Sequence, residues 1–154
     1  MSKLLGWIIT VIVAFTVMLG PVIQLSAQNV AQSKNSSYNY ADVFVDKVTD
    51  KGSITIKDVD ALNFDLASTG ITFDYRVVVQ RRVVFNDSIE YIADVSMDKK
   101  ALNASAALDI NLNKGDIVIL SLEPKTKLQS ETLLSLLAGV PVSRPDISIA
   151  GMVR

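Results

Sequence analysis

The chain begins with an uninterrupted apolar stretch. From Leu4 to Leu25 the sequence LLGWIITVIVAFTVMLGPVIQL has no charged residue, and its only polar side chains are Thr10, Thr16 and Gln24. Twenty-two residues span roughly 33 Å as a helix, which matches a hydrocarbon core of about 30 Å. No polar stripe interrupts the run, so the core helix of a soluble domain is a poor fit. The pattern predicts a transmembrane helix.

The alternative to a retained anchor is a cleaved signal peptide. Leu25-Ser26-Ala27 offers a cleavage site in which Ala27 suits the last position, but Leu25 is larger than usual and the apolar run is long for a signal peptide. Retention is therefore the leading interpretation. Lys3 precedes the stretch and the next cation, Lys34, lies well after it. The positive-inside rule then places the N-terminus in the cytoplasm and the remaining chain outside the cell membrane.

Two short patterns inside the stretch concern helix packing and helix shape. Gly6, Thr10 and Ala14 recur at every fourth position and form one face where another helix could approach closely, although small residues are common in membrane helices. Gly20 and Pro21 predict a kink or a local loss of helix, because proline lacks the amide donor and clashes with the preceding turn.

The segment after the apolar stretch predicts two helices. The first runs from Ser26 towards Asp50 and stops at Gly52, with a break expected in NSSYNY (35–40) and a restart near Tyr38. Its apolar positions at helical spacing are Ala41, Phe44, Val45 and Val48. The second is capped by Thr55, with Asp58 three positions on, and ends at Gly70. Its apolar face is formed by Val59, Leu62 and Leu66.

The remainder predicts an antiparallel sheet. Residues 71–80 alternate as a strand does, and 83–85 either extend that strand or return as its neighbour. Its two faces are Phe73, Tyr75, Val77 and Val79 on one side and Asp74, Arg76 and Gln80 on the other. Residues 86–114 are ambiguous, and the elements that fit there are a strand at 91–95 and a short helix at 101–108. A turn at 113–116 precedes a buried strand, IVILSLE, which Pro124 ends.

The C-terminal part predicts one more helix and one more strand. Ser130 caps the helix, whose leucines run to Gly139: Leu133, Leu134, Leu136 and Leu137. Pro141 and Pro145 frame a linker. ISIAGMVR closes the chain as a strand with one apolar face: Ile147, Ile149 and Val153. The fold class is α+β, with an N-terminal stub and transmembrane helix at 1–27, an amphipathic helical continuation at 28–52, and an extracytoplasmic domain at 53–154.

Composition restricts the possible chemistry. The 154 residues, less the apolar leader, suffice for one domain of ordinary size. The net charge of -1 argues against a nucleic-acid partner. The sequence has no cysteine and no histidine, which removes disulfides, thiolate ligands, and the commonest general base and metal ligand. We expect no cofactor, no metal and no small-molecule substrate, and an enzyme is the least favoured class.

Three patterns in the sequence resemble functional sites. A calcium loop around Gly52 fails because Lys47 and Lys51 fall where oxygen ligands are required. Ser96 and Lys99 match the S-x-x-K pattern of a serine nucleophile, but no companion motif follows and a solvated turn explains them better. The third pattern is a small basic cluster around the first strand that could contact an acidic partner or lipid headgroups: Arg76, Arg81 and Arg82. A solvated strand face is its default explanation.

The overall layout resembles the TadE-like pseudopilins, in particular those of Gram-positive pilus and conjugation-type gene clusters. The resemblance lies in VFVDKVTDKGSIT, FDLASTGITFDYRVVVQRR, NKGDIVILSL and ISIAGMVR, which cover most of the domain. It implies a pilin-like fold and a structural or assembly subunit of a surface filament or secretion machine, with other copies or related subunits and the lipid bilayer as partners. Pilins of the main class carry glutamate at the fifth position after their cleavage site. Counted from Gly6 that position is Val11, which puts processing by a prepilin peptidase in doubt.

The sequence therefore favours a single-pass, pilin-like protein of the cell membrane, with its domain extracytoplasmic or incorporated in an extracellular filament. The alternative is a membrane-tethered or released protein-binding module. A continuous helix through 26–50 would favour the pilin interpretation, and a break followed by a concave apolar pocket would favour the binding module.

Overall fold

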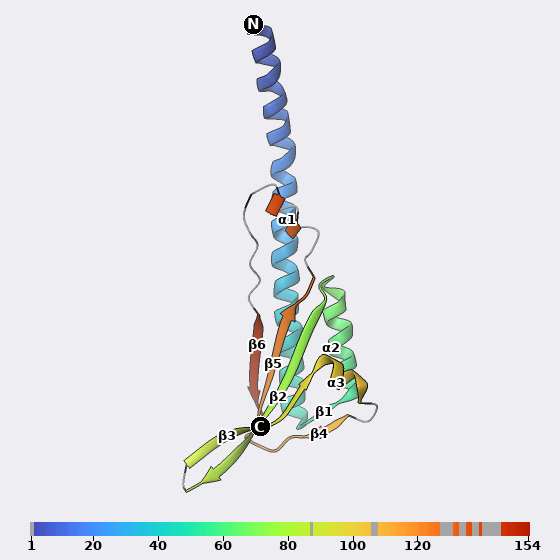
Figure 1. Cartoon of the computed structure of the whole chain (residues 1–154), viewed down its shortest axis with the longest axis vertical. Coiled ribbons are helices and arrows are strands. Elements are labelled where there is room, and N and C mark those ends of the chain that lie inside the picture. The colour runs from blue at the N-terminus through green and yellow to red at the C-terminus, as the bar shows by residue number, and fades with distance from the viewer. Residues whose placement is uncertain are drawn as a thin grey trace. The chain divides into compact units, whose positions relative to one another are not determined.

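The computed structural model describes residues 2–86, 88–105, 108–126, 131–132, 135–136, 139 and 146–154. The chain divides into two compact units (Figure 1). One comprises Met1–Gln32 and Lys127–Ser143, and the other comprises Ser33–Thr126 and Arg144–Arg154. The second unit is called the sheet domain below. Most of the predicted helix from Ser130 to Gly139 and the linker framed by Pro141 and Pro145 lie outside the described residues.

The first helix, α1 (Ser2–Lys51), is longer than predicted because it does not break in the NSSYNY segment. The expected break was wrong, since the domain buries Ser37 and its hydroxyl bonds to a carbonyl one turn back within the helix instead of competing with the helix. Ser37 is fully buried and donates to the carbonyl of Ser33 at 2.8 Å, while the Ser33 hydroxyl donates to the carbonyl of Thr69 at 3.3 Å. The predicted stop is confirmed: Gly52 has φ 71° and its N–H donates to the Val48 carbonyl at 3.0 Å.

The second helix, α2 (Ile56–Ser68), forms as predicted, with Val59, Leu62 and Leu66 buried. Two strands of three residues each were not predicted, because they are too short to show a periodicity: β1 (Ser53–Thr55), just before α2, pairs antiparallel with β4 (Asp109–Asn111). The helix proposed for 101–108 is instead α3 (Lys99–Ala104), which buries Leu102. Residue Leu108 then leads into β4 and is itself buried.

The main sheet has the order β3-β2-β5-β6, and every neighbouring pair is antiparallel. Its strands are β2 (Phe73–Phe85), β3 (Ser88–Asp98), β5 (Ile117–Pro124) and β6 (Ile147–Met152). Residues 83–85 extend the first strand, and the strand suggested at 91–95 belongs to the longer β3. Because β2 pairs with β5 only as far as Gln80, its last five residues continue as a two-stranded hairpin with β3.

The core lies on one face of the sheet. The predicted inward set Phe73, Tyr75, Val77 and Val79 is buried, as is the predicted face of α1 formed by Ala41, Phe44, Val45 and Val48. Both predictions are confirmed. The last strand also forms as expected, with Ile149 and Val153 buried and Gly151 against α1. We call the other side of the sheet, which carries Asp74 and Arg76, the open face.

Candidate interaction surfaces

The N-terminal half of α1 exposes a continuous apolar surface. Large side chains there are far more exposed than the core side chains of the sheet domain, including Trp7 at 72%, Phe15 at 64% and Met18 at 74%. Among the described residues one helix is long and apolar enough to cross a membrane, and its most apolar window has no buried residue. An apolar surface of this kind is unfavourable in water unless another surface covers it. In a lipid bilayer it is stable, because a helix satisfies its backbone hydrogen bonds internally.

The predicted packing residues are all on this exposed part of α1. Gly6, Thr10 and Ala14 are exposed, and the Thr10 hydroxyl donates to the Gly6 carbonyl at 2.9 Å. No described atom outside the helix's own backbone lies within 4 Å of a Cβ placed at Gly6 or Gly20. Pro21 lies inside α1, which remains helical on both sides of it.

The three arginines of the predicted basic cluster do not form one free positive patch. The Arg76 Nε donates to Asp98 Oδ1 at 2.7 Å, and the Arg81 Nε donates to Asp94 Oδ2 at 2.6 Å. Both acids come from β3, so two of the three charges are balanced across the β2–β3 ladder. The Asp94 carboxylate beside Arg81 raises the pKa of that guanidinium above its ordinary value. Arg82 has no ion pair with a described residue.

A buried carboxylate at the base of the hairpin was missed by the sequence analysis. Asp116 is 2% exposed and accepts hydrogen bonds from the backbone N–H groups of Asn113 at 2.8 Å and Arg82 at 3.2 Å. The Val153 N–H donates to its carbonyl at 2.9 Å, so the turn, the hairpin and the C-terminal strand meet at this residue. The turn predicted at 113–116 was the signal in the sequence that pointed to this position. The roles of Arg82 and Val153 could not be predicted, because both lie far from Asp116 in the sequence.

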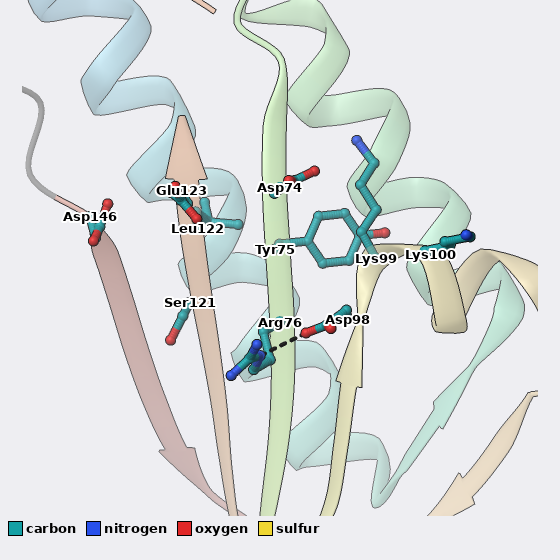
Figure 2. A pocket seen from close by; sticks show the side chains of 10 residues that line it. All are labelled: Asp74, Tyr75, Arg76, Asp98, Lys99, Lys100, Ser121, Leu122, Glu123 and Asp146. Carbon is teal, nitrogen blue, oxygen red and sulfur yellow. Dashed lines mark hydrogen bonds and ion pairs between the residues drawn. The ribbon is translucent and has the colours of Figure 1, made fainter. Parts of the chain in front are cut away.

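The open face carries a polar depression of about 560 Å³ near the other end of the sheet (Figure 2). Residues of both charges line it, including Asp74, Arg76, Asp98, Lys100, Glu123 and Asp146. Lys99 also lines it and donates to the Phe73 carbonyl at 2.8 Å, with its Nζ 5.6 Å from the centre of the Tyr75 ring. Lys99 is thus held by a backbone acceptor and an aromatic face. In the part of the chain that the structure describes, no cluster of acidic side chains could hold a metal ion.

Tyr75 supports this region from the buried side of the sheet. Its ring is 2% exposed, and its hydroxyl donates to Asn63 Oδ1 on α2 at 3.0 Å. Burial raises the pKa of the Tyr75 hydroxyl to about 12. The tyrosine is therefore a neutral structural link between β2 and α2.

The hairpin that extends beyond the four-stranded part of the sheet has two distinct faces. Directly opposed residues in an antiparallel ladder share a face, and the pairs are Arg82↔Tyr91, Val84↔Ile89, Val83↔Glu90, Phe85↔Ser88 and Arg81↔Ile92. We call the first face, formed by Arg82, Val84, Ile89 and Tyr91, face one. We call the opposite face, formed by Arg81, Val83, Phe85, Ser88, Glu90 and Ile92, face two. This surface could not be predicted from the sequence, because apolar residues on both faces obscure the strand alternation.

Comparison with known proteins adds no identification: no family model, no curated protein and no solved structure matches this chain.

Proposed function

We propose that the protein is a membrane-anchored, pilin-like subunit that assembles with other copies or related subunits at the cell surface. The observation that supports this proposal is that one helix, α1, carries both an exposed apolar span and the buried face of the sheet domain. Leu25 on the first part is 60% exposed, whereas Val45 on the second is 1% exposed. A continuous helix that joins an anchor to a small antiparallel sheet is the arrangement expected for a pilin-like subunit.

The physical mechanism follows from the two halves of α1. The apolar span is stable in the bilayer, where its backbone bonds are satisfied internally. Neighbouring subunits can replace lipid around it without exposing it to water, and close approach is easiest along Gly6, Thr10 and Ala14. The cytoplasmic placement of the N-terminus and the extracytoplasmic placement of the sheet domain remain part of the proposal and depend on the charge of Lys3.

A tethered protein-binding module is the second candidate, and the polar depression on the open face is the feature that favours it. That depression is lined mainly by charged side chains of both signs, many already paired, whereas specific binding pockets are mostly apolar with a few polar groups. The uninterrupted α1 also lacks the break that would favour this function. The subunit function is therefore the better supported of the two.

The test is to recover the native protein from membranes and from sheared surface material, and to determine its intact mass and N-terminal sequence. The proposal predicts an intact N-terminus in a sheared fraction that sediments as an assembly. A protein beginning at Gln28 and found only in the soluble fraction would contradict it, because the apolar span would then have served as a signal peptide.

A further inference from the structure

The end of the β2–β3 hairpin is apolar on both of its faces. Face one exposes Val84 by 63% and Ile89 by 53%, and face two exposes Phe85 by 64% and Ile92 by 52%. Exposed apolar patches of this extent mark surfaces that contact another protein or a membrane. Two aromatic rings, Phe85 and Tyr91, together with Arg82 give the composition that is enriched at the energetic centres of protein interfaces.

The two faces carry opposite charges. Face one holds Arg82 beside Tyr91, and face two holds Glu90 directly opposite Val83. At the base of the hairpin, Arg81 forms ion pairs with the carboxylates of Asp94 and Asp116. Within the described part of the chain, this leaves Arg82 and Glu90 without an ion-pair partner. Each face therefore combines an apolar surface with one unbalanced charge.

We propose that face one of one copy docks on face two of a second copy, so that Arg82 pairs with Glu90 of the neighbour across an apolar contact. Contact between two identical faces would place two charges of the same sign in one interface, either two Arg82 or two Glu90, with no opposite charge to pair with them. A contact between unlike faces leaves one face free at each end of a pair, so it can add further copies into an open chain or a ring.

This inference rests on the proposed function, because copies anchored in the same membrane by α1 all have the same orientation. It names the contact surface that the assembly would use within the sheet domain. A chain that grows by one repeated contact between unlike faces keeps that orientation from copy to copy, since no two-fold rotation relates the neighbours.

A lipid surface fits the hairpin less well. Arg82 is the neighbour of Val83 in the chain, and Glu90 lies opposite Val83 in the ladder. If the apolar end of the hairpin inserted into a bilayer as far as Val83, both charges would move towards the hydrocarbon, which is unfavourable. The two charges also cancel, which removes the attraction to anionic lipids that basic membrane-binding hairpins use. At a protein contact the same two charges are satisfied by each other.

The test exchanges the two charges in the full-length chain in membranes, with amine-reactive cross-linking as the readout. We expect Arg82→Glu and Glu90→Arg each to reduce covalent species larger than a dimer by roughly tenfold or more. Combining both substitutions in one chain restores Glu–Arg pairing and should restore the cross-linked ladder. Co-expression of the two single variants should also restore it, because each variant then carries the face that complements the other.

Arg76→Glu is the control, since it makes the same charge reversal at another exposed arginine of β2, outside the two-stranded end of the hairpin, and should leave the ladder unchanged. Limited proteolysis verifies that each variant retains the folded sheet domain. A ladder that survives both single substitutions, or one that the double exchange fails to restore in a folded protein, would overturn the inference. A wild-type chain that gives no ladder and does not sediment would instead overturn the proposed function.

Discussion

Gly151 of β6 lies so close to Val45 of α1 that a Cβ at position 151 would come within 2.6 Å of the valine Cγ1. The same Cβ would come within 3.2 Å of Thr49 Cγ2. Neither neighbour can move away easily, because Val45 is 1% exposed and Thr49 is 3% exposed. The glycine therefore allows the last strand to sit directly on α1, and any side chain there must push the strand and helix apart.

Gly151→Ala is expected to lower the free energy of unfolding of the sheet domain by about 1–3 kcal/mol, the usual range for overpacking a tight contact. Denaturant unfolding of the full-length protein in detergent measures it. Ala150→Ser is the matched control, since Ala150 is exposed on the open face of the same strand. Equal stability of Gly151→Ala and the control would show that the two elements are not packed as closely as described.

Asp58 joins the end of α1 to the start of α2. It is 3% exposed and accepts from the Thr55 N–H at 3.0 Å, from Lys51 Nζ at 2.8 Å and from Lys47 Nζ at 3.1 Å. Asp58→Asn removes the charge but keeps the shape, and we expect it to cost about 2 kcal/mol of stability. Asp60→Asn, at an exposed position of the same helix, should be close to neutral in the same unfolding measurement.

The pH dependence of stability should report on the same carboxylate. Burial by itself would raise the pKa of Asp58, but its hydrogen bonds from Lys51, Thr55 and Lys47 outweigh burial and hold that pKa well below its ordinary value. A lowered pKa in the folded state stabilises the protein above the pKa of the unfolded state, about 4, and this stabilisation is lost as the pH falls below it. The stability difference between wild type and Asp58→Asn should therefore shrink between pH 5 and roughly pH 2. A difference that stays constant over this range would contradict the assignment.

Tyr75 should give a distinct late step when the protein is titrated with base. Because its pKa is raised to about 12, its phenolate should form well above the ordinary tyrosine value of about 10, and this late step should vanish in Tyr75→Phe. Because this pKa is raised in the folded state, the neutral Tyr75 hydroxyl contributes fully to the free energy of unfolding below about pH 10. This contribution is lost as the pH rises towards 12. Ultraviolet difference absorbance measures the titration. A late step that persists in Tyr75→Phe would assign the buried hydroxyl to another tyrosine.

Local periodicity was sufficient to predict the parts of the fold in which one face is buried. The alternation from Phe73 to Val79 and the helical spacing from Ala41 to Val48 each place one set of side chains in the core, and the structure buries both sets. Gly52 could be predicted as a stop because it alone can take the positive φ that ends α1. Such signals depend only on neighbours in the sequence.

The features that were missed depend on residues far apart in the sequence. The break expected in 35–40 does not occur because the domain buries that face of α1, including Ser37, and the nearby Ser33 hydroxyl donates to the carbonyl of Thr69, the residue that caps the C-terminus of α2. The short β1–β4 pair is held by Ile54, which is fully buried, but three residues are too few to show a period. Likewise, Arg76 and Arg81 could be located on a strand, whereas their partners depend on the register of β3 and on the bulge near Gln80.

The small-residue face of the apolar span provides a test of assembly that is independent of the sheet domain. Gly6→Leu or Ala14→Leu would place a large side chain where helix backbones need to approach, so either substitution should weaken self-association in the membrane by on the order of 1 kcal/mol. Val11→Leu is the matched control, since it adds a similar apolar side chain at an exposed position one residue after Thr10 and off this face. Self-association is measured by energy transfer between labelled full-length chains diluted into increasing amounts of lipid. If all three variants associate as the wild type does, the face formed by Gly6, Thr10 and Ala14 is not a contact between copies.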